Sequence, residues 1–107
     1  MAEPLFTLTS PSATGRRLEV AGELDVAASS ALRAALAELV DGGGDVTVDL
    51  SEVTFIDSTA LSVLVHGHTE LASAGGRLIV TNPSRVVVRL LHLVGLFTLL
   101  DIEGSAE

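Results

Sequence analysis

The spacing of apolar residues switches repeatedly between two repeats along this chain, and this limits the possible folds more than any other feature. Val46, Val48 and Leu50 alternate with polar residues, which is typical of a strand with one buried face. The segment from about Ser58 to Ala74 instead spaces its apolar residues three and four apart, as an amphipathic helix does. A strand that leads directly into a helix is the repeating unit of α/β proteins.

The same two patterns extend over the whole chain and predict one α/β domain. We expect strands at Leu5–Thr9, Arg17–Leu24, Asp45–Ile56, Arg77–Val80 and Phe97–Ile102, and helices at Val26–Val40, Ser58–Ala74 and Arg85–Val94. Turn residues at Ser10–Gly15 favour an antiparallel first pair, whereas helical crossovers predict parallel strands after it. At 107 residues, we expect a single domain over residues 1–107, with a mixed, mostly parallel sheet of about five strands and three or more helices.

The charge and composition of the chain exclude several classes of partner. The net charge is −8, from six arginines, no lysine and 14 acidic residues, so the chain lacks the basic footprint that nucleic acids and anionic membranes require. There is no cysteine for a disulfide, a catalytic thiol or a zinc site. The start, MAEPLFTLTS, is unlike a signal peptide, and no stretch reaches the roughly 18 apolar residues of a membrane span. We expect a cytoplasmic protein.

The segment TFIDSTALSVLVH, from Thr54 to His66, places Ser58 where a predicted strand meets a predicted helix. Serine is a preferred helix cap, so the simplest interpretation of Ser58 is a cap. A nucleophilic serine would need a base nearby, and the glycines of the G-x-S-x-G motif are missing. His66 lies roughly 12 Å further along the same helix, which leaves only His92 to approach through the tertiary fold.

Neither a nucleotide site nor a metal site is expected. A Walker-type loop needs glycines and a lysine, which VTFIDSTA lacks, although a helix start could still bind an anion loosely. His66 and His68 are two residues apart on a predicted helix, so they point roughly 200° apart and cannot hold one ion together. We expect His66 to face solvent and His68 to be at least half-buried. No cofactor is predicted.

Four segments in register resemble STAS domains, the family of sulphate-transporter and anti-sigma-factor-antagonist domains. They are VAGELD, VTVDLSEVTFIDSTALSVL, AGGRLIV and LLHLVGLFTLL. The resemblance runs from about Arg17 to Ile102 and implies a STAS-like fold for this core. It also implies a non-enzymatic, bacterial regulator of transcription that acts by binding other proteins.

The resemblance further implies a phosphorylation site. Bacterial antagonists of this family carry a serine in a D-S-[ST]-[GA] turn, which an anti-sigma factor with GHKL-type kinase activity phosphorylates. The unphosphorylated form binds that anti-sigma factor and frees the sigma factor, phosphorylation releases it, and a serine phosphatase resets it. The matching serine here is Ser58. The expected partner contacts are Asp25, Asp57, Ser58, Thr59 and Ser62.

The resemblance leaves several alternatives open. STAS domains also serve as non-catalytic subunits of stress-signalling and lipid-transport assemblies. Asp57 either accepts hydrogen bonds within its turn or holds the nucleotide-bound metal of the kinase. Ala60 stands where glycine is common in this turn. Many relatives continue into a further helix, so either this is a minimal member or one face of the sheet lies open, where a second copy could form a homodimer.

Overall fold

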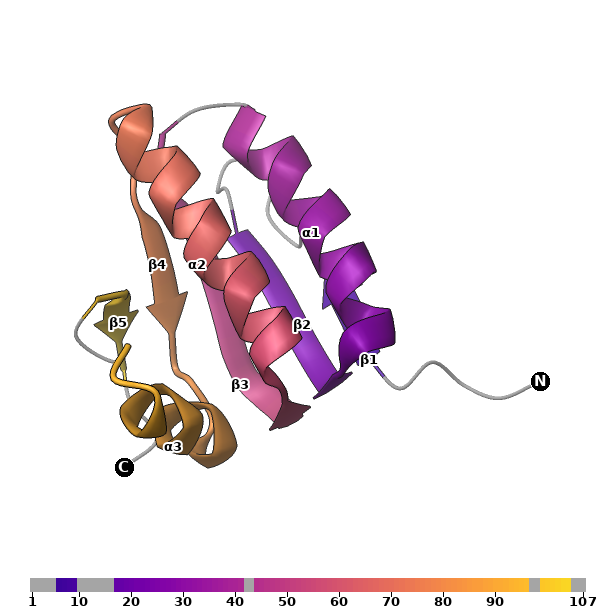
Figure 1. The fold of residues 1–107 in the computed structure, drawn as a ribbon. Coiled ribbons are helices and arrows are strands. Elements are labelled where there is room, and N and C mark those ends of the chain that lie inside the picture. The colour runs from indigo at the N-terminus through magenta and orange to yellow at the C-terminus, as the bar shows by residue number, and fades with distance from the viewer. Residues whose placement is uncertain (1–5, 10–16, 42–43, 97–98, 105–107) are drawn as a thin grey trace.

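The computed structural model describes residues 6–9, 17–41, 44–96 and 99–104, in which strands and helices alternate (Figure 1). The elements are β1 (Phe6–Thr9), β2 (Arg17–Leu24), α1 (Val26–Asp41), β3 (Val46–Ile56), α2 (Ser58–Ser73), β4 (Leu78–Thr81), α3 (Arg85–Leu93) and β5 (Asp101–Glu103). Their order is the one predicted from the apolar spacing.

One five-stranded sheet has the spatial order β1-β2-β3-β4-β5. β1 is antiparallel to β2, and β2 to β5 are parallel. The helices α1 and α2 lie side by side on one face of the sheet, while α3 lies near the carboxyl end of β4 and contacts β3 (Figure 1). This mixed, mostly parallel α/β sheet confirms the predicted fold class.

The hydrophobic core fills the space between the sheet and the two helices on its face. β3 contributes Val46, Val48 and Leu50, which are fully buried, as their strict alternation predicted. The other large contributions are also aliphatic: Leu18, Val20 and Leu24 from β2, Ala28, Leu32 and Leu36 from α1, and Leu61, Leu64 and Leu71 from α2. Burial of each large aliphatic side chain stabilises the fold by about 1.5–3 kcal/mol, so this layer fixes the positions of both helices.

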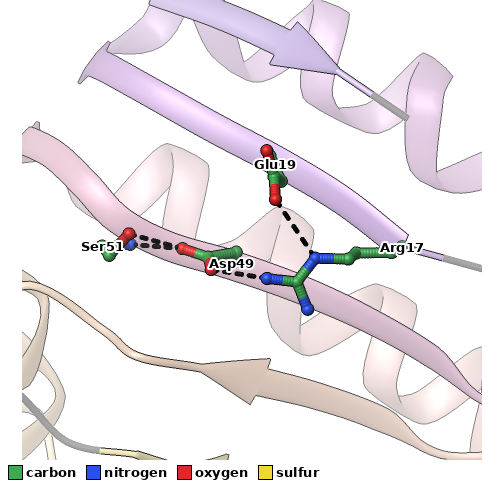
Figure 2. A network of polar contacts seen from close by, with 4 residues as sticks. All are labelled: Arg17, Glu19, Asp49 and Ser51. Atoms are coloured by element: carbon green, nitrogen blue, oxygen red, sulfur yellow. Dashed lines mark hydrogen bonds and ion pairs between the residues drawn. The ribbon is translucent and has the colours of Figure 1, made fainter. Parts of the chain in front are cut away.

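The opposite face of β2 and β3 carries a polar network (Figure 2). The Arg17 guanidinium donates from Nη2 to Asp49 Oδ2 at 2.7 Å and from Nε to Glu19 Oε2 at 3.2 Å. Ser51 donates to Asp49 Oδ1 from its backbone N–H at 2.9 Å and from its hydroxyl at 2.7 Å. Burial alone raises the pKa of Asp49, but the bonds from Ser51, with Arg17 and Asn82, outweigh it and hold the pKa below its usual value. These residues give the face a polar surface, and a homodimer through it stays a prediction.

The last strand is shorter than predicted. The prediction of a strand at Phe97–Ile102 is wrong for Leu99 and Leu100, because the strand begins at Asp101. The N–H groups of Leu99 and Leu100 both donate to the carbonyl of Leu96, which folds this part of the apolar run into a turn. Phe97 lies outside the described residues, as do Thr98, Leu5 and the turn predicted at Ser10–Gly15.

The helical spacing of apolar residues also predicts Ala72 and Val94 on apolar helix faces, but both residues are exposed. Ala72 follows the buried Leu71 on α2 and is rotated by about 100° from it, toward solvent. Val94 is 47% exposed because α3 ends at Leu93. Gly95 then turns the chain away with a φ of 76°, a left-handed conformation that suits glycine at a helix end.

Candidate functional site

Two similar turns lie next to each other at the carboxyl edge of the sheet. β2 ends at Leu24 and β3 at Ile56, which are register partners, and an aspartate follows each. The N–H of Ala28 donates to Asp25 Oδ1, and that of Ala60 donates to Asp57 Oδ1, both at 3.0 Å. Each carboxylate therefore satisfies an orphan donor in the first turn of the helix that it starts.

The two turns are also joined to each other. The N–H of Asp57 donates to the carbonyl of Leu24 at 3.2 Å, across the boundary between the two strand ends. This bond, together with the pairing of Leu24 and Ile56, fixes the start of α2 relative to the start of α1.

The residue that caps α2 is Asp57, so the interpretation of Ser58 as the helix cap is wrong. Asp and Ser are both good caps. The extended backbone of Asp57, with φ −112° and ψ 179°, places its own carboxylate over the helix start. The prediction that Asp57 accepts a hydrogen bond within its turn is confirmed, and Asp25 caps α1 in the same way.

Ser58 is the first residue of α2, and its side chain is exposed. Its hydroxyl forms no hydrogen bond with any residue that the structure describes. The free N–H groups and the positive end of the helix dipole lie at the same place, and both favour a negative charge. The hydroxyl of Ser58 therefore lies at the surface, on a turn whose backbone is fixed by Asp57, and takes no part in the cap itself.

Only part of the predicted site lies on one surface. Ser58 and Ser62 are exposed one turn apart on α2, and both line one groove. Thr59 is half-buried next to Ser58, while Asp25 is half-buried in the neighbouring turn with its carboxylate engaged in capping. Neither Thr59 nor Asp25 is among the residues that line the groove.

The groove has a volume of about 470 Å³ and lies between α2 and the segment that follows α3. Its lining combines hydroxyls with aliphatic side chains: Ser58, Leu61, Ser62, Val65, His66, Thr69, Val94 and Leu96. The aliphatic members were not predicted as site residues from the sequence, because an apolar stripe on a helix predicts core contacts. The half-buried Val65, at the edge of that stripe, was the one available signal.

Of the three histidines, His66 lines the groove beside Ser58, whereas His92 lines a different hollow, on α3. His66 is exposed, as predicted, and its Nε2 lies 3.5 Å from Glu70 Oε2 on the same helix. His68 is half-buried, as predicted, and its buried Nδ1 has no hydrogen-bond partner among the residues that the structure describes. Within the described ranges, no three His, Asp or Glu side chains gather closely enough to hold a metal ion.

None of the helices described is long and apolar enough to cross a membrane.

Residues 9–101 match the protein family described as "Mlab, STAS domain". This chain belongs to the STAS-domain family. The resemblance inferred from the four sequence segments is therefore confirmed. The STAS domain is 34% identical over 91 residues to the anti-sigma-B factor antagonist of Bacillus subtilis (strain 168), which covers 85% of this chain and 84% of that protein.

Solved structures show the same fold for this STAS domain. An anti-sigma factor antagonist from Mycobacterium paratuberculosis superposes with a TM-score of 0.81 at 24% identity, over 96% of this chain and 90% of that one. The Bacillus cell fate determinant SpoIIAA in its phosphorylated form superposes with a TM-score of 0.68 at 23% identity, over 95% and 91% of the two chains.

Ala60, at the position where the resemblance to STAS domains implies a glycine in many relatives, fits the turn. Its side chain is fully buried and belongs to the core beneath α2. Its backbone N–H still donates to Asp57, so the methyl group leaves the cap intact.

Proposed function

We propose that this STAS domain is an anti-sigma factor antagonist whose binding to an anti-sigma factor is controlled by phosphorylation of Ser58. Its similarity to the anti-sigma-B factor antagonist of B. subtilis supports this function. The observation that carries the proposal is the Ser58 hydroxyl, which is exposed at the start of α2 and has no hydrogen bond with a described residue. Because Asp57 caps the helix, Ser58 is available for modification.

A phosphate on Ser58 changes the surface without requiring a change of fold. It adds about −1.5 to −2 charge and three acceptor oxygens. The helix dipole and the free N–H groups of the first turn accommodate this charge. The folded domain therefore stays in one conformation while its surface chemistry changes.

The same phosphate prevents docking of the anti-sigma factor. In the unphosphorylated form, the partner packs over Ser58, Thr59 and Ser62 and reaches the adjoining turns at Asp25 and Asp57. A dianion at Ser58 then has to be desolvated and lies close to the Asp57 carboxylate, which adds repulsion. A loss of about 3 kcal/mol weakens binding by roughly a hundredfold, which is enough for a switch.

In this proposal the domain is a binding module and a kinase substrate, and it is not itself an enzyme. The anti-sigma factor, a GHKL-type kinase, transfers the phosphoryl group to Ser58, and a serine phosphatase removes it. Release of the anti-sigma factor from its sigma factor then controls transcription. These partners act in the cytoplasm, where we place this domain as well.

A second candidate function is a non-catalytic subunit of a stress-signalling or lipid-transport assembly, with Ser58 unmodified. The family match leaves this candidate open, because the family description, "Mlab, STAS domain", names the domain and no anti-sigma factor. Such a subunit would use the surface around Ser58 to bind the other proteins of its assembly permanently. The state of Ser58 in the native cell therefore separates the two functions.

The test combines the mass of the native protein with the binding of Ser58 variants. Intact-mass spectrometry of protein from its native cells should show a fraction heavier by one phosphoryl group, and the anti-sigma kinase with ATP should produce the same form. Ser58→Ala should bind the anti-sigma factor persistently, and Ser58→Glu should bind it poorly. Equal affinities of wild type, Ser58→Ala and Ser58→Glu for this partner would contradict the proposal.

A further inference from the structure

The outer face of α3 is basic, although the chain as a whole is acidic. The helix contains no acidic residue, and Arg85, Arg89 and His92 follow one another at spacings of four and three, so they share one side. All three are exposed, in a chain of net charge −8. This face therefore has the opposite charge to the rest of the molecule.

The two arginines of this face differ from those on the sheet. Arg17 pairs with Asp49 and Glu19, and Arg77 pairs with Asp101. Arg85 and Arg89 form neither an ion pair nor a hydrogen bond with side chains of the described residues. Their guanidinium groups remain available to carboxylates from another molecule.

Apolar side chains lie directly beside these arginines. A hollow of about 440 Å³ is lined by Arg85, Val88, Arg89, His92 and Leu93. Leu93 is 77% exposed, more than any other large hydrophobic residue described. An exposed apolar patch rimmed by polar residues is typical of an interaction site.

We propose that this α3 face, made by the five residues that line the hollow, is a docking surface for an acidic amphipathic segment of a partner protein. Arg85 and Arg89 are one helical turn apart, about 5–6 Å, which matches carboxylates spaced three or four apart on a partner helix. Guanidinium groups bind carboxylates through two parallel hydrogen bonds, which orients the partner. Its apolar side chains then cover Val88 and Leu93.

Charge also selects this occupant over a polyanion. An anionic membrane or a nucleic acid presents many negative charges, which the net charge of −8 repels. A short acidic segment carries few charges and can contact the two arginines alone. None of the five residues lines the groove beside Ser58, so this surface does not overlap the groove of the proposed switch.

The test is photo-crosslinking from this surface in the native cell. Leu93 of the full chain is replaced by p-benzoyl-L-phenylalanine, and the crosslinked peptide is sequenced by mass spectrometry. We expect a segment of another protein that is rich in Asp and Glu and has apolar residues at helical spacing. The same replacement at the exposed Ala37 on α1 is the control and should not capture this segment.

Charge reversal then tests the role of the two arginines. Combining R85E/R89E with the crosslinker should lower the yield at least about tenfold, since it turns attraction into repulsion. The matched control is R33E, at another exposed arginine without an ion pair, which should change the yield less than about twofold, because it lies on α1. Far-UV circular dichroism checks that each variant folds. If R85E/R89E does not fold, R85Q/R89Q takes its place.

Several outcomes would overturn the proposal. The absence of any crosslink from position 93 would contradict the proposal. A crosslink to a lipid or to a second copy of this chain would assign the surface to a different occupant. A captured segment without acidic residues, or a yield that R85E/R89E and R85Q/R89Q leave unchanged, would show that the arginines do not select the partner.

Discussion

The two turns at the carboxyl edge of the sheet have nearly the same backbone design but differ in the side chains that they present. Both begin with an aspartate whose Oδ1 accepts from the N–H three residues later at 3.0 Å. The first turn reads D-V-A-A, from Asp25 to Ala28, and the second reads D-S-T-A, from Asp57 to Ala60. The second position of both turns is exposed, with Val26 in one and Ser58 in the other.

This comparison separates the structural role of the turn from its functional role. An aspartate cap and a buried alanine are enough to start either helix, so neither of them marks a functional site. What distinguishes the α2 turn is a free hydroxyl on the second residue and the groove that continues from it past Ser62. The predictions below test this difference.

The largest difference is expected when a charge is placed at the second position of each turn. Ser58→Glu should weaken binding of the anti-sigma factor by about a hundredfold, which corresponds to about 3 kcal/mol. Val26→Glu adds the same charge at the equivalent position of the first turn. It should weaken binding by less than about tenfold, because Val26 does not line the groove. Isothermal titration calorimetry measures both affinities. Similar losses for both variants would mean that the partner covers the two turns equally.

Removal of the caps should reveal how similar the two turns are. Asp25→Ala and Asp57→Ala should each lower the free energy of unfolding by about 1 kcal/mol, because each leaves an orphan N–H in a first helical turn. Urea denaturation followed by circular dichroism measures both losses. Asparagine at either position keeps an acceptor and should restore most of the stability. A loss at only one of the two positions would show that the turns are not equivalent.

A third aspartate, Asp49, binds Arg17 across β2 and β3 instead of capping a helix (Figure 2). Its substitution should lower the free energy of unfolding by less than removal of either cap does. Asp49→Asn keeps the acceptor for Ser51 but loses the charge that faces Arg17 at 2.7 Å. We expect a loss of about 0.5 kcal/mol near neutral pH, since Arg17 is partly exposed.

The effect of Asp49→Asn should depend on pH. The pKa of Asp49 is lowered in the folded state, so protonation favours the unfolded chain. The contribution is complete above the unfolded pKa of about 3.9 and is lost as the pH falls through the lower, folded value. The stability difference between wild type and variant should therefore shrink as the pH falls below about 3.9 and disappear below the folded pKa. The control for Asp49→Asn is Glu19→Gln, which removes the charge of the more exposed partner of Arg17. A difference that persists at low pH would contradict the ionic origin.

The sequence predicted the fold well where one face of an element is buried. The alternation at Val46, Val48 and Leu50 and the helical spacing after Ser58 are typical of a strand and a helix with one buried face, and the predicted order of elements is confirmed. The run from Phe97 to Leu100 lacks such a pattern. An apolar run alone does not tell a strand from a turn that buries Leu100 and exposes Leu99.

The candidate site was only partly predictable for a similar reason. Asp57 and Ser58 are adjacent, and both residue types cap helices well, so the sequence alone could not assign the cap. The groove depends on how the end of α3 lies against α2. Val94 and Leu96 are distant from Ser58 in the chain, and their place in the groove follows from tertiary packing that the apolar pattern does not encode.

The smallest expected effect comes from a transplant of the second turn onto the first. V26S/A27T in a Ser58→Ala background gives the first turn the sequence D-S-T-A behind the same type of aspartate cap. We expect no phosphorylation of this variant by the anti-sigma kinase above that of Ser58→Ala alone. The substitutions supply the hydroxyl but not Ser62, Val94 and Leu96, which line the groove beside the native site.

Phosphopeptide mapping after incubation with the kinase and ATP measures this directly, with the wild-type chain as the positive control. Incorporation at position 26 at a rate near that of Ser58 would show that a capped hydroxyl at a helix start is sufficient for the kinase. The groove would then serve binding alone. If Ser58 is modified in the wild-type chain and position 26 of the variant is not, the surroundings of the turn select Ser58, because both turns then have the sequence D-S-T-A.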